Sequence, residues 1–150
     1  MKYNISLNQA EMKKMVEISI DVRYPDCDQM AIVHHAVYPI WYEMGRMALF
    51  EKCGFNYTAT KKLGIDPAMV HLDMNYGKPV RFPQTVTLKT YCSLLQGKKM
   101  GFKYQLFQGE DEEPSATAES FHIWVKDGAS INIESEFPEV FSAYKKELEQ

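Results

Sequence analysis

The sequence predicts an α+β domain in which a mainly antiparallel sheet packs against one long helix. Residues 38–54 carry apolar side chains at helical spacing, and alternating apolar and polar stretches joined by short turns follow them. No strand–helix–strand rhythm occurs, which argues against a parallel sheet. The 150 residues suit a single domain, 1–150, with a core of ordinary size.

The first elements should be an extension, a strand and a loop. Residues 1–13 are polar and weakly patterned, and we interpret them as an N-terminal extension. Residues 15–24 alternate apolar and polar side chains and are enriched in β-branched types, which predicts a half-buried strand. Residues 26–35 have no clean period, so we expect the strand to pass into a loop.

Two helices should follow. The longer one begins near Tyr38 and is stopped by Gly54, a length of about four turns. Its apolar face is unusually wide, so we expect it to be covered on more than one side. Residues 56–64 suggest a shorter helix that ends at Gly64.

The rest of the chain should form the sheet and close with a helix. The predicted strands are, in order, 68–80 with a break near Gly77, then 84–96, 100–108 and 115–126, and a short candidate at 130–133. Residues 137–150 are expected to be a polar C-terminal helix that is prone to fraying. One apolar helix and one long sheet together predict a sheet that curls around the helix.

Composition narrows the class of protein. The net charge of -3 and pI near 5.8 argue against a nucleic-acid or membrane-surface binder, because both need a basic face. No apolar run approaches the roughly 18 residues that span a bilayer, and no leader pattern opens the sequence. The three cysteines are widely spaced and form no CxxC pair, so reduced thiols and a cytoplasmic location are expected.

Several candidate metal ligands lie close together in the segment "YPDCDQMAIVHHAVYPIWYE", which first suggests a metal site. Its candidate ligands are Cys27, Asp28, His34 and His35. Neighbouring residues of an extended chain point in opposite directions, and the other two histidines lie far away in the sequence. We therefore expect no metal and no cofactor.

Cys27 and the aspartates are the candidates for other chemistry. Cys27 stands between two carboxylates, which disfavour a thiolate, so it is a poor nucleophile. Asp26 and His34 fit structural roles better than chemical ones. Asp28 could simply form an Asx-turn. However, residues 30–33 are apolar enough to dip into the interior, and the chain then leads into the long helix, whose free N–H groups and dipole favour negative charge. That combination can hold a polarised carbonyl oxygen beside an attacking carboxylate or water.

"DCDQMAIVHHAVYPIWYE", followed by "LFEKCGF", resembles the 4-hydroxybenzoyl-CoA thioesterase family of hotdog-fold acyl-CoA thioesterases. The similarity continues through "YGKPVRFPQTV" and "GKKMGFKYQLF" and covers about residues 15–140. It implies a hotdog fold, with an antiparallel sheet of about five or six strands wrapped around a long central helix. It also implies a homodimer or homotetramer whose active site lies at the subunit boundary.

The resemblance implies roles for five residues. Asp28 matches the catalytic aspartate, a nucleophile or a general base on water, and Tyr24 matches a site tyrosine of some bacterial members. His35, seven residues after Asp28, would polarise the thioester carbonyl through its N–H and orient water or assist the thiolate through its ring. Lys98 and Lys99 match positions that meet CoA phosphates. From the residues alone, Tyr24 could equally be strand packing, and the two lysines could simply solvate a hairpin.

Two positions depart from the family pattern. Ala31 stands where the family usually has glycine, so the backbone there must accept a Cβ atom. His35 replaces the tyrosine of the benzoyl-CoA enzyme, which points to the broader acyl-CoA branch.

The leading hypothesis is an acyl-CoA thioesterase that hydrolyses an acyl thioester to a carboxylic acid and free CoA. An acyl-carrier-protein thioesterase, a non-catalytic module that binds acyl thioesters, and a dehydratase acting on thioesters are the alternatives. The expected partners are the thioester and further copies of the chain, not nucleic acid or membrane.

Overall fold

The computed structural model describes residues 15–149, so the expected extension at residues 1–13 lies outside the described residues. The elements are, in chain order, β1 (Met15–Asp21), the 3-10 turn η1 (Tyr24–Asp26), α2 (Tyr38–Lys52), α3 (Tyr57–Leu63), β2 (Ile65–Tyr76), β3 (Thr85–Gln96), β4 (Lys99–Gln108), β5 (Ala116–Lys126), β6 (Ala129–Ser130), α4 (Ile133–Glu136) and α5 (Pro138–Glu149).

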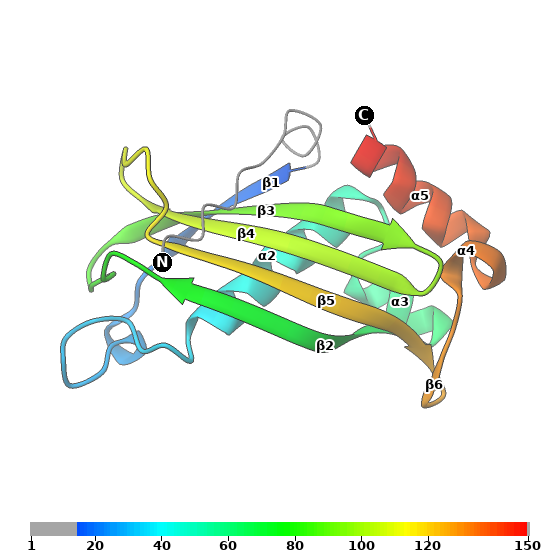
Figure 1. Cartoon of the computed structure of the whole chain (residues 1–150), viewed down its shortest axis with the longest axis horizontal. Coiled ribbons are helices and arrows are strands. Elements are labelled where there is room, and N and C mark those ends of the chain that lie inside the picture. The colour runs from blue at the N-terminus through cyan, green and yellow to red at the C-terminus, as the bar shows by residue number, and fades with distance from the viewer. Residues whose placement is uncertain (1–14, 150) are drawn as a thin grey trace.

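The strands form one antiparallel sheet in the order β1-β3-β4-β5-β2, and β6 pairs with the end of β5. The sheet curls, with α2 lying against one of its faces (Figure 1). β1 and β2 are its two outer strands. The predicted α+β class with an antiparallel sheet is therefore confirmed.

The helix α2 sits very close to the sheet. Gly45 faces β3, where a Cβ atom would collide with the side-chain oxygen of Thr90, so only a glycine permits this approach. The ring of Tyr42 stacks on Tyr104 of β4 with the ring centroids 4.6 Å apart. Both rings are buried, and aromatic stacking of this kind adds to the stabilisation from burial.

The predicted second helix is confirmed as α3. The side chain of Asn56 accepts a hydrogen bond from the N–H of Ala59 at its start, and Gly64 ends it with a left-handed φ of 71°. The chain then enters β2 directly, so this strand begins at Ile65 rather than at residue 68.

The C-terminal segment differs from its prediction. The short strand expected at 130–133 is only Ala129–Ser130, because the Asn132 side chain caps the N–H groups of the next residues and starts α4. The helix α5 is not the purely polar helix that was expected. Its Val140, Phe141 and Tyr144 are buried, and the Tyr144 hydroxyl donates to the carbonyl of Phe55 at 2.8 Å. Three apolar positions on one face were enough to dock it on the core.

No helix within residues 15–149 is both long enough and apolar enough to cross a bilayer.

Candidate active site

A tight hairpin places Asp28 beside the segment that leads into α2. Cys27 and Val33 form an antiparallel bridge, and the N–H of Asp28 donates to the carbonyl of Ile32 at 2.9 Å. One step further, the N–H of His34 donates to the carbonyl of Asp26 at 2.8 Å. The two arms of residues 26–34 therefore run side by side, and Asp28 lies opposite Ile32, in the segment that leads to α2.

The Asp28 carboxylate is half-buried and has one oxygen engaged. Its Oδ1 accepts a 2.7 Å hydrogen bond from the N–H of Met30, which is the Asx-turn that the sequence allowed. Oδ2 has no hydrogen-bond partner among the described residues. The Asx-turn thus orients the carboxylate and leaves one oxygen open, so the structural and the chemical interpretations are compatible.

Ala31 explains why glycine suits this position in the family. Its φ is 57°, in the left-handed region that a Cβ atom disfavours. Arg81 fixes the turn from outside, because its Nη1 donates to the Ala31 carbonyl at 3.0 Å.

Asp26 has the structural role expected of it. It is buried and accepts hydrogen bonds from the backbone N–H, Nε and Nη2 of Arg23 at 2.9, 3.2 and 2.7 Å. The hydrogen bond from the guanidinium holds the pKa of Asp26 below its usual value. This closed turn is also why β1 ends at Asp21, three residues before the strand end that the sequence predicted at Tyr24.

Two expectations about the loop are wrong. Tyr24 does not pack in a strand, because it belongs to η1, is 77% exposed, and meets the ring of Phe82 edge-on at 5.8 Å. The segment 30–33 was expected to descend into the interior, but Met30 is 69% exposed and Ala31 is exposed as well. Within this segment only Val33 is buried.

The two histidines differ in their contacts. His34 accepts a hydrogen bond at Nδ1 from the N–H of Ala36 at 3.0 Å, and its ring stacks on His35 with centroids 4.0 Å apart. The carbonyl of His35 accepts from the Tyr76 hydroxyl at 2.9 Å. The N–H of His35 finds no acceptor among residues 15–149, so it is available to a ligand.

The start of α2 is also uncapped. Val37 stands at the N-cap position and offers no side-chain acceptor, and Pro39 in the first turn has no N–H of its own. Within residues 15–149 no side chain caps α2, and its first turn holds no acidic residue that would neutralise the positive end of the helix dipole.

The turn between β3 and β4, which carries Lys98 and Lys99, lies at the opposite end of the sheet from the segment between η1 and α2, which carries Asp28 (Figure 1). β3 begins at Thr85, near the hairpin, and runs about 36 Å to Gln96, just before the lysines. Both lysines are exposed. A single chain therefore brings Asp28 and His35 to one end and leaves the lysines at the other.

The sequence interpretation missed three residues that support the hairpin. Arg81 donates a hydrogen bond to its backbone at Ala31, Tyr76 donates to the carbonyl of His35 directly after it, and Phe82 packs on Tyr24 shortly before it. All three lie in "YGKPVRFP", a stretch that carried the resemblance but to which no role was given.

No group of three metal-ligating side chains occurs among the described residues.

A model of the thioesterase-like superfamily matches residues 22–144. The chain belongs to the thioesterase-like superfamily. The matched range includes the hairpin, α2 and every strand except β1, so membership rests on most of the described fold.

Named relatives agree with this placement. A putative acyl-CoA thioesterase, YneP of Bacillus subtilis, is 35% identical over 129 residues, which are 85% of this chain and 93% of that protein. The chloroplastic acyl-acyl carrier protein thioesterase ATL3 of Arabidopsis thaliana is 25% identical over 114 residues, 76% of this chain and 60% of that protein. The crystal structure of a DHNA-CoA thioesterase from Staphylococcus aureus superposes with a TM-score of 0.82 at 29% identity, covering 88% of this chain and 89% of that one.

Proposed function

We propose that this protein hydrolyses an acyl thioester of CoA, or of an acyl carrier protein, to a carboxylic acid and a free thiol. The observation that carries the proposal is the hairpin of residues 26–34. It pairs the arm that carries Asp28, whose Oδ2 has no hydrogen-bond partner among the described residues, with the arm that continues through His35 into the uncapped start of α2. Family membership and the names of its relatives support the same reaction class.

The N–H of His35 and the dipole of α2 would stabilise the negative charge that develops on the thioester oxygen. Asp28 then has two routes. As a nucleophile, its oxygen bonds to the carbonyl carbon, the C–S bond breaks, the thiolate takes up a proton, and water hydrolyses the resulting anhydride. As a general base, Asp28 takes a proton from water, the water oxygen bonds to the carbonyl carbon, and the C–S bond breaks in the same way.

The His35 ring would orient the water or assist the departing thiolate. Tyr24, which is exposed on η1, would act as the site tyrosine that the resemblance implies. Appearance of ¹⁸O in Asp28 after one turnover in labelled water would identify the nucleophilic route.

Lys98 and Lys99 would bind the CoA phosphates of a site on another subunit. Within one chain they are remote from Asp28, so this role requires the homodimer or homotetramer that the resemblance implies. Light scattering should therefore give at least twice the mass of one chain. A monomer that retains full activity would remove the two lysines from the proposal.

A panel of acyl-CoAs incubated with a thiol reagent tests the function itself. The proposal expects release of thiol with at least one acyl class. Tight binding without release of thiol would favour a non-catalytic binding module, and loss of water from a hydroxyacyl thioester without free thiol would favour a dehydratase.

A further inference from the structure

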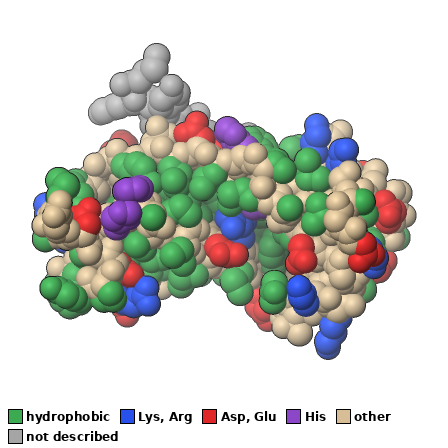
Figure 2. All heavy atoms as spheres, turned by 90° about the horizontal axis from the view of Figure 1, so that it is seen from below, with side chains coloured by type: hydrophobic (Ala, Val, Ile, Leu, Met, Phe, Trp, Pro, Cys, Tyr) green, Lys and Arg blue, Asp and Glu red, His purple; other side chains and the backbone are tan. Residues whose placement is uncertain are grey.

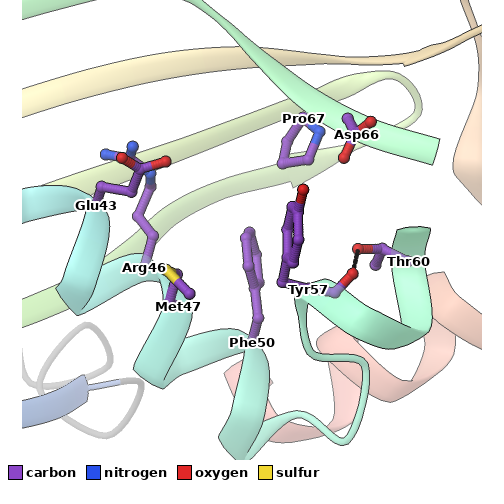
Figure 3. A pocket seen from close by; sticks show the side chains of 8 residues that line it. All are labelled: Glu43, Arg46, Met47, Phe50, Tyr57, Thr60, Asp66 and Pro67. Carbon is purple, nitrogen blue, oxygen red and sulfur yellow. Dashed lines mark hydrogen bonds between the residues drawn. The ribbon is translucent and has the colours of Figure 1, made fainter.

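A pocket of about 420 Å³ lies between α2, α3 and β2, away from the hairpin. Figure 3 shows Arg46 reaching it from α2, Tyr57 from α3 and Pro67 from β2. Met47 and Phe50 add apolar surface to its wall. Pockets of this size accept small molecules or the end of a long acyl chain.

Arg46 is a buried cation with most of its donors unused. Its side chain is only 8% exposed, yet none of the ion pairs formed within residues 15–149 includes it. Nη1 donates to the hydroxyl of Tyr104 at 2.9 Å, and no other described residue accepts a hydrogen bond from the guanidinium. A buried guanidinium without a carboxylate is costly unless something else accepts its hydrogen bonds.

A chain of buried hydrogen bonds holds Arg46 in place. Because a guanidinium can only donate, the Tyr104 hydroxyl accepts a hydrogen bond from it. The same hydroxyl then donates a hydrogen bond to the Ser120 hydroxyl at 2.7 Å. Ser120 donates to Nε2 of His122 at 3.0 Å, and Nδ1–H of His122 donates to the Pro67 carbonyl at 3.3 Å. Burial, reinforced by the charge of Arg46, lowers the pKa of His122 to about 4, so the ring is neutral and this direction holds. This series of hydrogen bonds begins at Arg46 and ends at Pro67, which both line the pocket. The wall formed by α2 is therefore fixed relative to the wall formed by β2.

The pocket also contains two carboxylates, which decides the charge of its ligand. Glu43 of α2 and Asp66 of β2 line it together with Arg46. One cation and two anions do not suit an anionic ligand. They suit a neutral hydroxyl group, which can accept a hydrogen bond from Arg46 and donate one to either carboxylate.

An apolar stripe on α2 joins the candidate active site to this pocket. Ile40, Met44 and Met47 are exposed and recur at spacings of four and three, so they lie on one side of the helix. Figure 2, the view from below Figure 1, shows hydrophobic side chains gathered beside an indentation of the surface. From Tyr38 to Arg46 the helix rises about 12 Å, which is the length of roughly ten carbons of an extended acyl chain.

We infer that the Arg46 pocket recognises a hydroxyl group near the far end of the substrate's acyl chain and so selects hydroxylated over plain alkyl acyl groups. This inference rests on the proposed thioester chemistry, because that chemistry places the reacting end at the start of α2. Arg46 is then a specificity-determining residue that donates a hydrogen bond to the ligand hydroxyl. Glu43 or Asp66 accepts the hydrogen bond that this hydroxyl donates.

Thioether analogues test the pocket without any turnover. Binding of S-decyl-CoA, S-(10-hydroxydecyl)-CoA and S-(9-carboxynonyl)-CoA is measured by calorimetry on the full chain. The hydroxyl analogue should bind about tenfold more tightly than the alkyl one, because a site built around a hydroxyl leaves its polar groups unpaired with an alkyl chain. In Arg46→Met this ratio should fall to about twofold or less, because the donor is gone. Lys62→Met removes an exposed charge from α3 outside the pocket and should leave the ratio unchanged.

A second variant keeps the test valid if Arg46→Met does not fold. Glu43→Gln combined with Asp66→Asn leaves Arg46 and its hydrogen-bond chain intact and makes the pocket cationic. The carboxylate analogue should then bind better than the hydroxyl one, a reversal of the wild-type order. Equal binding of alkyl and hydroxyl analogues to the wild type, no binding of either, or an unchanged order in the double variant would overturn the inference. Discrimination by a protein that releases no thiol from any acyl-CoA would refute the proposed hydrolysis and leave the pocket assignment standing.

Discussion

The hydroxyl of Tyr76, the last residue of β2, donates a 2.9 Å hydrogen bond to the backbone carbonyl of His35. The same ring meets Tyr38, the first residue of α2, edge-on with centroids 5.0 Å apart. An outer strand of the sheet therefore holds both the peptide that precedes α2 and the first turn of that helix. The position of the His35 N–H depends on this anchor.

Tyr76→Phe removes the hydrogen bond and keeps the ring. We expect kcat/KM for a thioester substrate to fall about tenfold, because the loss of about 1 kcal/mol of anchoring displaces the His35 N–H, which we propose stabilises the transition state. Thermal unfolding monitored by circular dichroism should change little, since Tyr76 is partly exposed.

Tyr91→Phe is the matched control for that variant. It also removes one hydroxyl hydrogen bond, to Gln105 at 3.0 Å, but between β3 and β4. Turnover should stay at the wild-type level. If both variants lose activity equally, the Tyr76 contact has no special role at the site.

Ala31→Gly should preserve or slightly raise the free energy of unfolding, by no more than about 1 kcal/mol. Glycine relieves the strain of the left-handed φ of 57°, and its greater freedom in the unfolded chain offsets part of the gain. Ala48→Gly, within α2, should instead cost about 1 kcal/mol. Urea denaturation of both variants gives the comparison, and an equal loss in the two would show that Ala31 is not strained.

Gly45→Ala should lower stability by about 1 to 2 kcal/mol, although alanine is the better helix former. The added Cβ would collide with the Thr90 hydroxyl and press on Leu88, both of which are buried. Adding Thr90→Ala should recover part of the loss in the double variant. A stabilising Gly45→Ala would mean that α2 does not lie against β3 at this distance.

Burial of His122 predicts loss of stability in acid. Its pKa is lowered to about 4 in the folded state, so between about pH 6.5 and 4 the unfolded chain binds the extra proton. Stability should therefore fall as the pH falls through this window, by up to about 3 kcal/mol. His122→Gln, which does not titrate there, should flatten this part of a stability–pH curve measured by urea denaturation. An unchanged slope would show that His122 is not the group responsible.

Patterns of local sequence predicted most of the elements. The helical spacing after Tyr38 and the stops at Gly54 and Gly64 are local signals, and both helices lie where these signals placed them. The C-terminal helix was misjudged because its burial depends on contacts with distant residues. The Tyr144 hydroxyl reaches the carbonyl of Phe55, 89 positions away, which no period along the helix reveals.

The candidate site could be predicted only in part for the same reason. Asp28 and His35 are close in sequence, so a local motif and the resemblance it carries were enough to propose them. Tyr76 and Arg81 reach the hairpin from 41 and 50 positions away, and nothing local marks them. The buried state of Arg46 likewise depends on Tyr104 of β4, 58 positions later.

The central claim is that the Asp28 carboxylate performs the chemistry, and Asp28→Asn tests it most directly. The substitution keeps an oxygen that can accept from the N–H of Met30, so the hairpin and the melting temperature should be preserved. With an acyl-CoA that the wild type hydrolyses, kcat should fall by about 10²- to 10⁴-fold, because neither a nucleophilic carboxylate nor a general base remains. Near-wild-type release of thiol by the folded variant would contradict the account.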